Sequence, residues 1–265
     1  METMYFQQLW KTFANMQEVE AIALGGSRAG ENYDESSDYD LYIYCSRIPE
    51  EQRRREILEK YCSYMEVGNH FWELEDDCTL KNGVDIDILY RNIQDFTEEV
   101  AAVVEKCIAH NGYTTCMWHN VLHSNILYDE KGKFSAMQQR FNVPYPQKLQ
   151  ENIITQNMQL LTGKLPSYDK QIEKALSRQD WVSVNHRTAA FLESYFDVIF
   201  AINELTHPGE KRMVLYAKKH GKLLPELFEE NINALLKNLV EHPEKVPHIL
   251  ASMVEELRKI SESKY

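Results

Sequence analysis

The sequence has no apolar run that approaches the roughly 18 residues needed to cross a bilayer. Its five cysteines form no CxxC pair and are odd in number, so a reduced chain with mostly buried thiols is the simplest interpretation. The first residues, Met-Glu-Thr-Met-Tyr, lack the basic and then apolar pattern of a signal peptide. These absences predict a cytoplasmic protein without a membrane segment.

Basic residues are scarce relative to acidic ones, since 29 Lys and Arg stand against 41 Asp and Glu for a formal net charge of −12. Up to Tyr145 there are 13 basic and 25 acidic residues, and from Pro146 onward there are 16 of each. Proteins bind phosphate backbones through clustered Lys and Arg, so this balance disfavours nucleic acid as a partner. Because the acidic excess is confined to the first half, the two halves are expected to have different roles.

What is present suffices for a buried core, because 43% of the 265 residues are hydrophobic. The first half alternates segments of helical period with short runs of β-branched and aromatic residues, which predicts a sheet domain. Strands are expected at 19–24, 39–45, 71–80, 84–90 and 126–128, and helices at 6–15, 50–64 and 92–110.

The second half shows helical spacing throughout and no convincing strand. Helices are expected at 147–164, 168–177, 181–205, 211–220, 227–240 and 246–261. The predicted fold class is therefore α+β: an N-terminal mixed-sheet domain over residues 1–143, followed by an all-α helical bundle over residues 144–265.

The most informative stretch is a glycine turn at residues 24–30, Leu-Gly-Gly-Ser-Arg-Ala-Gly, at the end of the first predicted strand. Gly25 and Gly26 let the backbone turn sharply and approach a ligand closely. If Ser27 begins a helix, the free amides there can receive phosphate oxygens and its hydroxyl adds another donor. The turn is thus a candidate phosphate-binding element.

Two pairs of acidic residues follow on predicted strands. Asp38 and Asp40 flank Tyr39, and the period of two places both carboxylates on one face of the strand. Asp85 and Asp87 repeat the pattern on a later apolar strand. Like charges on one face repel unless a cation neutralises them, and Mg²⁺ suits oxygen ligands beside a triphosphate. If the two strands are neighbours, up to four carboxylates converge, which is enough for two metal ions.

This combination resembles the polymerase-β-like nucleotidyltransferase superfamily, whose signature is a Gly-Ser turn, an Asp-x-Asp strand and a third acid on another strand. It rests on Gly26-Ser27-Arg28, on Ser37-Asp38-Tyr39-Asp40-Leu41 and on the later strand acid. One departure is that the glycine closing the turn commonly lies one residue further on than Gly30. The resemblance covers about residues 18–130. With its helical second half, the chain is similar to the small-molecule nucleotidyltransferases that modify aminoglycosides or lincosamides.

The resemblance implies roles for particular residues. Those expected to contact the nucleotide are Gly25, Gly26, Ser27 and Arg28, with Lys211 and Arg212 at a helix start in the bundle as further candidates. The expected Mg²⁺ ligands are Asp38, Asp40 and a third acid, Asp87 or Asp85. We prefer Asp87, because the Ile-Leu-Tyr-Arg that follows it is similar to the family's strand ending. Asp85 is then a fourth ligand or a general base, and spacing does not decide between these roles.

The leading functional interpretation is transfer of a nucleoside monophosphate, from ATP, to a hydroxyl of a small molecule such as an aminoglycoside-like antibiotic. Pyrophosphate would be released, and two Mg²⁺ ions would be the cofactors. One alternative is nucleotidylation of an RNA end or of a protein, as toxin-like members of the superfamily do. Another is a non-catalytic nucleotide-binding module.

Two further charged runs have plainer interpretations. Glu73, Glu75, Asp76 and Asp77 are expected on a solvated edge strand, or else as an acidic rim that attracts a cationic acceptor. The basic run 53–55 is flanked by glutamates and is expected to be a solvated helix face.

Overall fold

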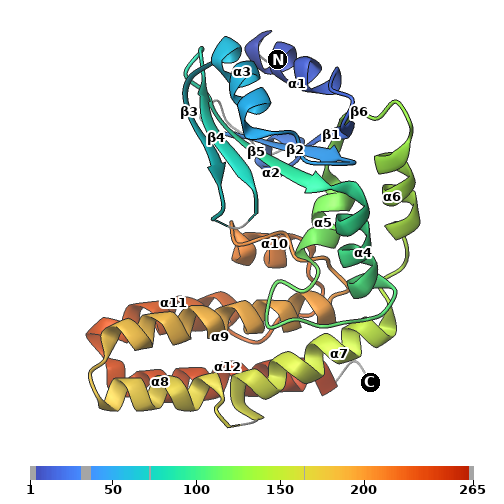
Figure 1. Ribbon diagram of the computed structural model, residues 1–265. Helices are drawn as coiled ribbons and strands as arrows, with labels where there is room; N and C mark the ends of the chain where they lie inside the picture. The colour runs from blue at the N-terminus through green and yellow to red at the C-terminus, as the bar shows by residue number, and fades with distance from the viewer. Residues whose placement is uncertain (1–3, 31–36, 72, 164, 263–265) are drawn as a thin grey trace. The chain divides into compact units, whose positions relative to one another are not determined.

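The computed structural model of the chain describes residues 4–30, 37–71, 73–163 and 165–262. These residues form two compact units. The first, called the sheet unit below, contains residues 1–101 and 120–143, and the second, the helical unit, contains residues 102–119 and 144–265. Figure 1 shows the helices and strands of both.

The sheet unit is built on a six-stranded mixed sheet. Its strands are β1 (Val19–Leu24), β2 (Tyr39–Cys45), β3 (Cys62–Asn69), β4 (Glu75–Leu80), β5 (Asp85–Asn92) and β6 (Asn125–Tyr128). They lie in the order β3-β4-β5-β2-β1-β6, and only β2 and β5 pair in parallel among these strands. The sheet-unit helices are α1 (Met4–Ala14), α2 (Gly26–Ala29), α3 (Glu51–Tyr61) and α6 (Lys133–Phe141), while α4 (Ile93–Val104) and α5 (Cys116–His123) have residues in both units.

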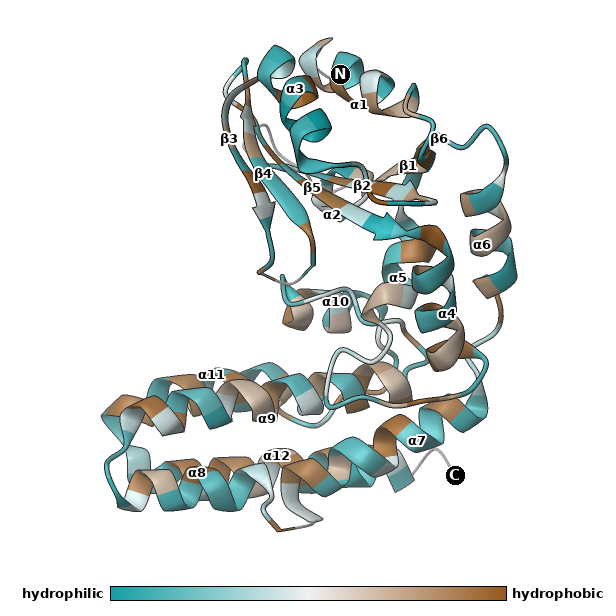
Figure 2. Cartoon of the chain, in the orientation of Figure 1, coloured by the Kyte–Doolittle hydropathy of each residue, from teal (hydrophilic) through white to brown (hydrophobic). Residues whose placement is uncertain are grey.

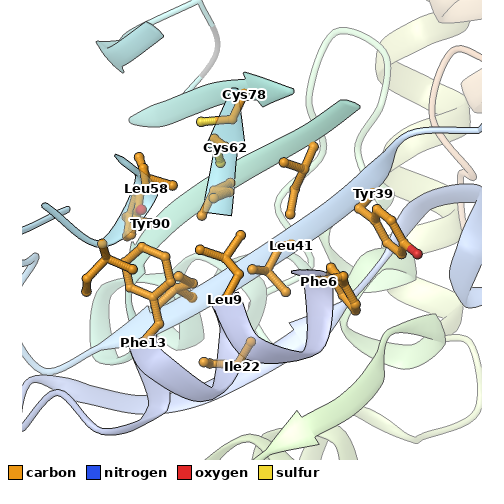
Figure 3. Packing of buried hydrophobic residues seen from close by; sticks show 14 of the residues in the cluster. Phe6, Leu9, Phe13, Ile22, Tyr39, Leu41, Leu58, Cys62, Cys78 and Tyr90 are labelled. Carbon is orange, nitrogen blue, oxygen red and sulfur yellow. The ribbon is translucent and has the colours of Figure 1, made fainter. Parts of the chain in front are cut away.

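The alternation of residues along the strands gives the sheet one apolar and one partly polar face. Helices α1 and α3 cover the apolar face with side chains such as Phe6, Leu9 and Leu58, which pack on Leu41 and Ile88 of the central strands (Figure 3). Burying this much apolar side-chain area is the main stabilising term of the unit. The opposite face carries Asp40 and Asp87 and also Tyr44, which is buried against Phe96 and Phe134.

The sequence failed to predict β3 and α6. Residues 62–64 were expected to end a helix, but the chain leaves α3 at Tyr61 and enters β3 directly. The pairing of β3 with β4 shifts register between Cys62 and Tyr64, so Cys62 and Met65 both face the core although they are three residues apart in the sequence. The strand therefore lacks the alternation with period two by which a strand is recognised in a sequence.

The solvated-face interpretation of the basic run is wrong for Arg54. This side chain is 3% exposed, and it donates to Asp76, which is fully buried in β4. The amide of Gly68 donates to the same carboxylate at 2.9 Å, and the guanidinium carbon of Arg54 lies 4.6 Å from the centroid of the Tyr90 ring. A charge is tolerated in this core because it is paired and hydrogen-bonded.

The helical unit contains α7 (Gln147–Met158), η1 (Gln159–Gly163), α8 (Tyr168–Ser177), α9 (Trp181–Ile202), α10 (Met213–His220), α11 (Phe228–Glu241), η2 (Pro243–Lys245) and α12 (Val246–Glu262). In Figure 2 hydrophobic and hydrophilic residues alternate along α7, α8 and α9, as expected for helices that bury one face. No strand occurs in the described part of this unit, so the prediction of an α+β fold with a helical second half is confirmed.

Residues 102–119 pack within the helical unit, although they precede the domain boundary expected after residue 143. Thr114 donates to the buried Asp197 of α9 through its amide at 3.1 Å and its hydroxyl at 2.7 Å. The amide of Gly112 donates to Asn157 of α7 at 3.1 Å. The division into domains 1–143 and 144–265 stays a prediction, but compactness assigns this segment to the second unit.

None of the described helices is long and apolar enough to cross a membrane. All five cysteines are free thiols, three of them buried.

Asp197 should give the helical unit a distinctive pH dependence. Burial raises the pKa of Asp197 to about 7, against the opposing effect of hydrogen bonds from Thr114 and Asn157. Since its pKa in the unfolded chain is near 4, the native state holds the proton more strongly, and the free energy of unfolding falls as pH rises from about 4 to about 7. We expect Asp197→Asn to reduce the difference in Tm between pH 5 and pH 8, measured by differential scanning fluorimetry.

Asp180→Asn is the control, because a hydrogen bond from Ser183 lowers the pKa of Asp180 and this exposed carboxyl does not titrate above pH 5. An unchanged Tm difference in Asp197→Asn would contradict the assignment.

Candidate functional site

The glycine turn lies where β1 ends and α2 begins, against side chains of β2. The amide of Gly25 donates to the carbonyl of Asp40 at 2.9 Å. Gly26 has φ +57°, and a Cβ at this position would lie 1.7 Å from Oδ2 of Asp40. A side chain at residue 26 is thus excluded by both the backbone conformation and the Asp40 carboxylate. Ser27 follows with an exposed side chain.

Three carboxylates lie side by side across neighbouring strands. Asp40 of β2 is the register partner of Asp87 of β5, and Asp87 in turn lies opposite Asp77 of β4. Residues directly opposite in neighbouring strands point to the same face of a sheet, so these three carboxylates form a row, called the carboxylate row below. The structure therefore brings Asp40 and Asp87 together, as the sequence predicted, and adds Asp77.

Electrostatic repulsion is strongest at the centre of the carboxylate row. The pKa of Asp87 is raised to about 6, first by burial and then by the charges of Asp40, Asp38, Asp77 and Glu75. Because like charges disfavour the ionised form, the row is under strain at neutral pH unless positive charge is supplied. This is the arrangement expected of a site that binds a cation or a cationic group.

Asp38 lies directly before β2 and is half-buried. The backbone beside it is held by Arg28, whose Nε donates to the carbonyls of Ser37 at 2.7 Å and Asp38 at 3.1 Å. The guanidinium carbon of Arg28 lies 4.1 Å from the centroid of the Tyr39 ring. Arg28, predicted to contact the nucleotide, thus has a structural contact with the segment that carries Asp38.

Asp85 has a different environment from Asp87. Its side chain is exposed, and its Oδ1 accepts a hydrogen bond at 2.8 Å from Oγ1 of Thr79, its register partner on β4. The hydrogen bond from Thr79 fixes the orientation of the Asp85 carboxylate.

Asp77 and Glu75 are not among the predicted catalytic or metal-binding residues, because the sequence predicts their segment as a solvated edge strand or else an acidic rim for a cationic acceptor. The edge-strand interpretation is wrong: β3 is the edge strand, and β4 lies between β3 and β5. Glu75 and Asp76 are both buried, at 8% and 0% exposure. The sequence does contain a pattern that indicates their position, because Glu75, Asp77 and Thr79 occupy alternate residues of the strand. This alternation places all three on the face of the carboxylate row.

Lys211 and Arg212 belong to the helical unit, where they form the turn that leads into α10. Both side chains are exposed, and Arg212 has φ +60° at the N-cap of the helix. The nearby His207 is fully buried, its Nδ1 accepts from the amide of Gly209 at 3.1 Å, and burial lowers its pKa to about 3. A neutral imidazole therefore shapes the start of this turn.

The carboxylate row fits a divalent cation by the chemistry of its donors. All of its ligand atoms are carboxylate oxygens, which hard cations such as Mg²⁺ prefer, and the raised pKa of Asp87 reflects repulsion that such an ion would relieve. Within the described residues, no three His, Cys, Asp or Glu side chains are already arranged as a metal-ligand group.

Residues 7–104 match the family model described as "Polymerase beta, Nucleotidyltransferase". The chain contains a polymerase-β-like nucleotidyltransferase domain. The match spans α1 to α4, and so includes the glycine turn and every member of the carboxylate row. The predicted superfamily and the prediction of a nucleotidyltransferase are confirmed. Residues 115–213 match a second model, "Domain of unknown function (DUF4037)", which includes Lys211 and Arg212.

Solved structures also resemble this nucleotidyltransferase over nearly its whole length. A nucleotidyltransferase-like protein from Exiguobacterium sibiricum 255-15 has 10% identity and a TM-score of 0.44 over 98% of this chain and 75% of its own. An aminoglycoside 6-adenyltransferase from Bacillus subtilis has 10% identity and a TM-score of 0.31, with coverages of 100% and 90%. A CCA-adding enzyme from Thermotoga maritima complexed with tRNA has 12% identity and a TM-score of 0.25, with coverages of 98% and 80%. At these TM-scores none of them adds to what the family model shows. No curated protein sequence matches the chain.

Removing the central charge of the carboxylate row should stabilise the nucleotidyltransferase domain. In Asp87→Asn, the repulsion from Asp40 and Asp77 disappears, and so does the cost of burying a charge. Solvent screening keeps the expected gain to about 1 kcal/mol, or a rise in Tm of about 2–4 °C at pH 7.5 in a metal-free buffer. Asp85→Asn, at an exposed position, is the matched control and should leave Tm unchanged. A lower Tm for Asp87→Asn would contradict the repulsion.

Gly26→Ala should abolish nucleotide binding, because the new Cβ requires both a strained backbone and displacement of the Asp40 carboxylate. Gly83→Ala is the matched control: Gly83 has φ +85°, but a Cβ there meets no atom within 4 Å. Both variants should lose about 1 kcal/mol of stability to backbone strain. Only Gly26→Ala should lose affinity for Mg-ATP in isothermal titration calorimetry, and equal affinities for the two variants would contradict this account.

Proposed function

We propose that the protein transfers a nucleoside monophosphate, with ATP as the donor, to a hydroxyl of a small molecule, and releases pyrophosphate. The observation that carries the proposal is the contact between the glycine turn and the carboxylate row, where Gly26 lies directly against Asp40 and Asp40 lies beside Asp87. A phosphate-binding turn and oxygen ligands for a cation are thereby adjacent. This adjacency is what transfer from a Mg-triphosphate requires.

Each residue has a proposed role in this reaction. Gly26 and Ser27 would bind phosphate oxygens, and Gly25 would hold the turn against β2 through its hydrogen bond to Asp40. Asp38, Asp40 and Asp87 would hold one or two Mg²⁺ ions. Bound there, Mg²⁺ supplies positive charge that neutralises the triphosphate and polarises the bond to the leaving pyrophosphate. Lys211 and Arg212, exposed side chains of the helical unit, stay predicted nucleotide contacts. Arg28 is proposed to keep Asp38 in place through the backbone it binds.

The acceptor is proposed to be cationic as well as hydroxylated. Two acids of the segment 73–77 are neutralised within the protein, since Glu73 pairs with Arg91 and Asp76 pairs with Arg54. The other two are Asp77, which belongs to the carboxylate row, and Glu75 next to it on β4, where desolvation and the charge of Asp77 raise the pKa of Glu75. An amine on the acceptor would relieve this repulsion. Asp85 remains a candidate fourth ligand or general base for the acceptor hydroxyl.

We further propose that the reaction takes place in the cytoplasm. The support is that all five cysteines are free thiols, a state that reducing compartments maintain.

The test is pyrophosphate release by purified protein with Mg-ATP and a panel of acceptors that includes aminoglycosides, neutral polyols and an RNA 3′ end. We expect release with a cationic hydroxylated acceptor, and a loss of at least about a hundred-fold in Asp40→Asn and Asp87→Asn because the cation loses a ligand. Asp95→Asn, an exposed acid of α4, is the control and should keep wild-type activity.

The same experiment separates the alternatives. Release with RNA alone would replace the small-molecule acceptor with a nucleic-acid end. Binding of Mg-ATP without release with any acceptor would indicate a non-catalytic nucleotide-binding module instead.

A further inference from the structure

Arg91 is a buried cation for which the proposed reaction has no role. It lies on β5, four residues after Asp87 and thus on the same face of the sheet, and is 6% exposed. Its Nε and Nη2 donate to the two carboxylate oxygens of Glu73, both at 2.7 Å, and its Nη1 donates to Oδ1 of Asn120 at 2.9 Å. A bidentate pair of this kind fixes the plane of the guanidinium as well as its position.

That guanidinium packs against aromatic rings. Its central carbon lies 4.4 Å from the ring centroid of Tyr42 and 4.4 Å from that of Phe96. Tyr42 is 8% exposed, so its ring is almost wholly enclosed by the protein. The Tyr42 ring is therefore held at its face by stacking with Arg91.

The Tyr42 ring also touches the glycine turn. A Cβ at Gly25 would lie 2.1 Å from Cε2 of Tyr42, so the backbone of Gly25 is in direct contact with the ring. Asp40 and Tyr42 lie two residues apart on β2. Gly26 lies against Asp40, and Gly25 lies against Tyr42. The turn thus rests on two neighbouring side chains of one strand, and Arg91 fixes one of them.

We propose that Arg91 is a positioning residue for the glycine turn: it holds the Tyr42 ring against Gly25, and so sets the backbone that meets the phosphates of the nucleotide. Arg91 acts through Tyr42, with Glu73 and Asn120 holding its own orientation. Its effect on nucleotide affinity rests on the proposed function. Its effect on the order of the turn does not, because that follows from the packing alone.

The sheet unit offers a matched control on its other face. Arg54 is buried like Arg91, pairs with a buried acid, Asp76, and stacks on the ring of Tyr90. Along the strands, Asp76 alternates with Asp77 and Tyr90 with Arg91, so this cluster belongs to the face covered by α1 and α3. The two arginines share their kinds of contact and differ in which face of the sheet they support.

The experiment compares Arg91→Lys with Arg54→Lys in the full chain. Both substitutions keep the positive charge but replace the planar guanidinium with an ammonium group, which cannot reproduce its hydrogen bonds and ring stacking. Both should therefore lower Tm. Arg91→Lys should raise the Kd of Mg-ATP at least ten-fold and the KM for ATP more than it lowers kcat, whereas Arg54→Lys should leave Kd within two-fold of wild type. In the nucleotide-free protein, hydrogen exchange of the Gly25 amide, which donates to the carbonyl of Asp40, should speed up at least ten-fold in Arg91→Lys and stay at the wild-type rate in Arg54→Lys.

Wild-type exchange at Gly25 in a folded Arg91→Lys protein would overturn the proposal, as would equal changes in the two variants. If Arg91→Lys does not fold, Tyr42→Leu takes its place, since it removes the ring that joins Arg91 to Gly25 and should produce the same faster exchange. If wild type binds no nucleotide but the exchange rates differ as expected, the proposed function fails while the positioning role stands.

Discussion

Repulsion between carboxylates on neighbouring strands is the constraint around which the sheet unit is arranged. Asp40, Asp87 and Asp77 occupy adjacent register positions on one face, and their mutual charge helps to raise the pKa of Asp87 to about 6. Such a row lowers stability in the absence of a cation, so the free energy of folding has to come from elsewhere. It comes from the opposite face, where α1 and α3 pack a continuous apolar core (Figure 3).

Two buried arginines divide the acidic segment before β5 into structural and functional parts. Arg54 neutralises Asp76 on the apolar face, and Arg91 neutralises Glu73 near the carboxylate row. What remains on the polar face is Asp77, together with the buried Glu75. Two of the four acids in the segment 73–77 are therefore paired within the protein, and the uncompensated charge of this segment is smaller than its sequence suggests.

The glycine turn shows how closely backbone and strand are matched. Gly25 lies on the Tyr42 ring and Gly26 on the Asp40 carboxylate, and a Cβ at either position would overlap the strand. Two consecutive glycines are therefore required for different reasons, because each avoids a different side chain and Gly26 also adopts a positive φ. The turn and the strand β2 that carries Asp40 and Tyr42 are therefore packed as one unit, and in the proposed function nucleotide binding would depend on this packing.

The sequence by itself determined the features that depend on local period: strands β1, β2 and β5, the helices of the second half, the glycine turn, and the pairs around Asp40 and Asp87. These are visible because alternation and turn chemistry act over a few residues. Tertiary structure alone decided that β3 forms despite its register shift, that β4 is an inner strand and brings Asp77 to the site, and that residues 102–119 join the helical unit. It also decided that Arg54 and Arg91 are buried. The physical reason is that strand order and ion pairing join residues distant in the chain, so their partners are chosen by the whole fold.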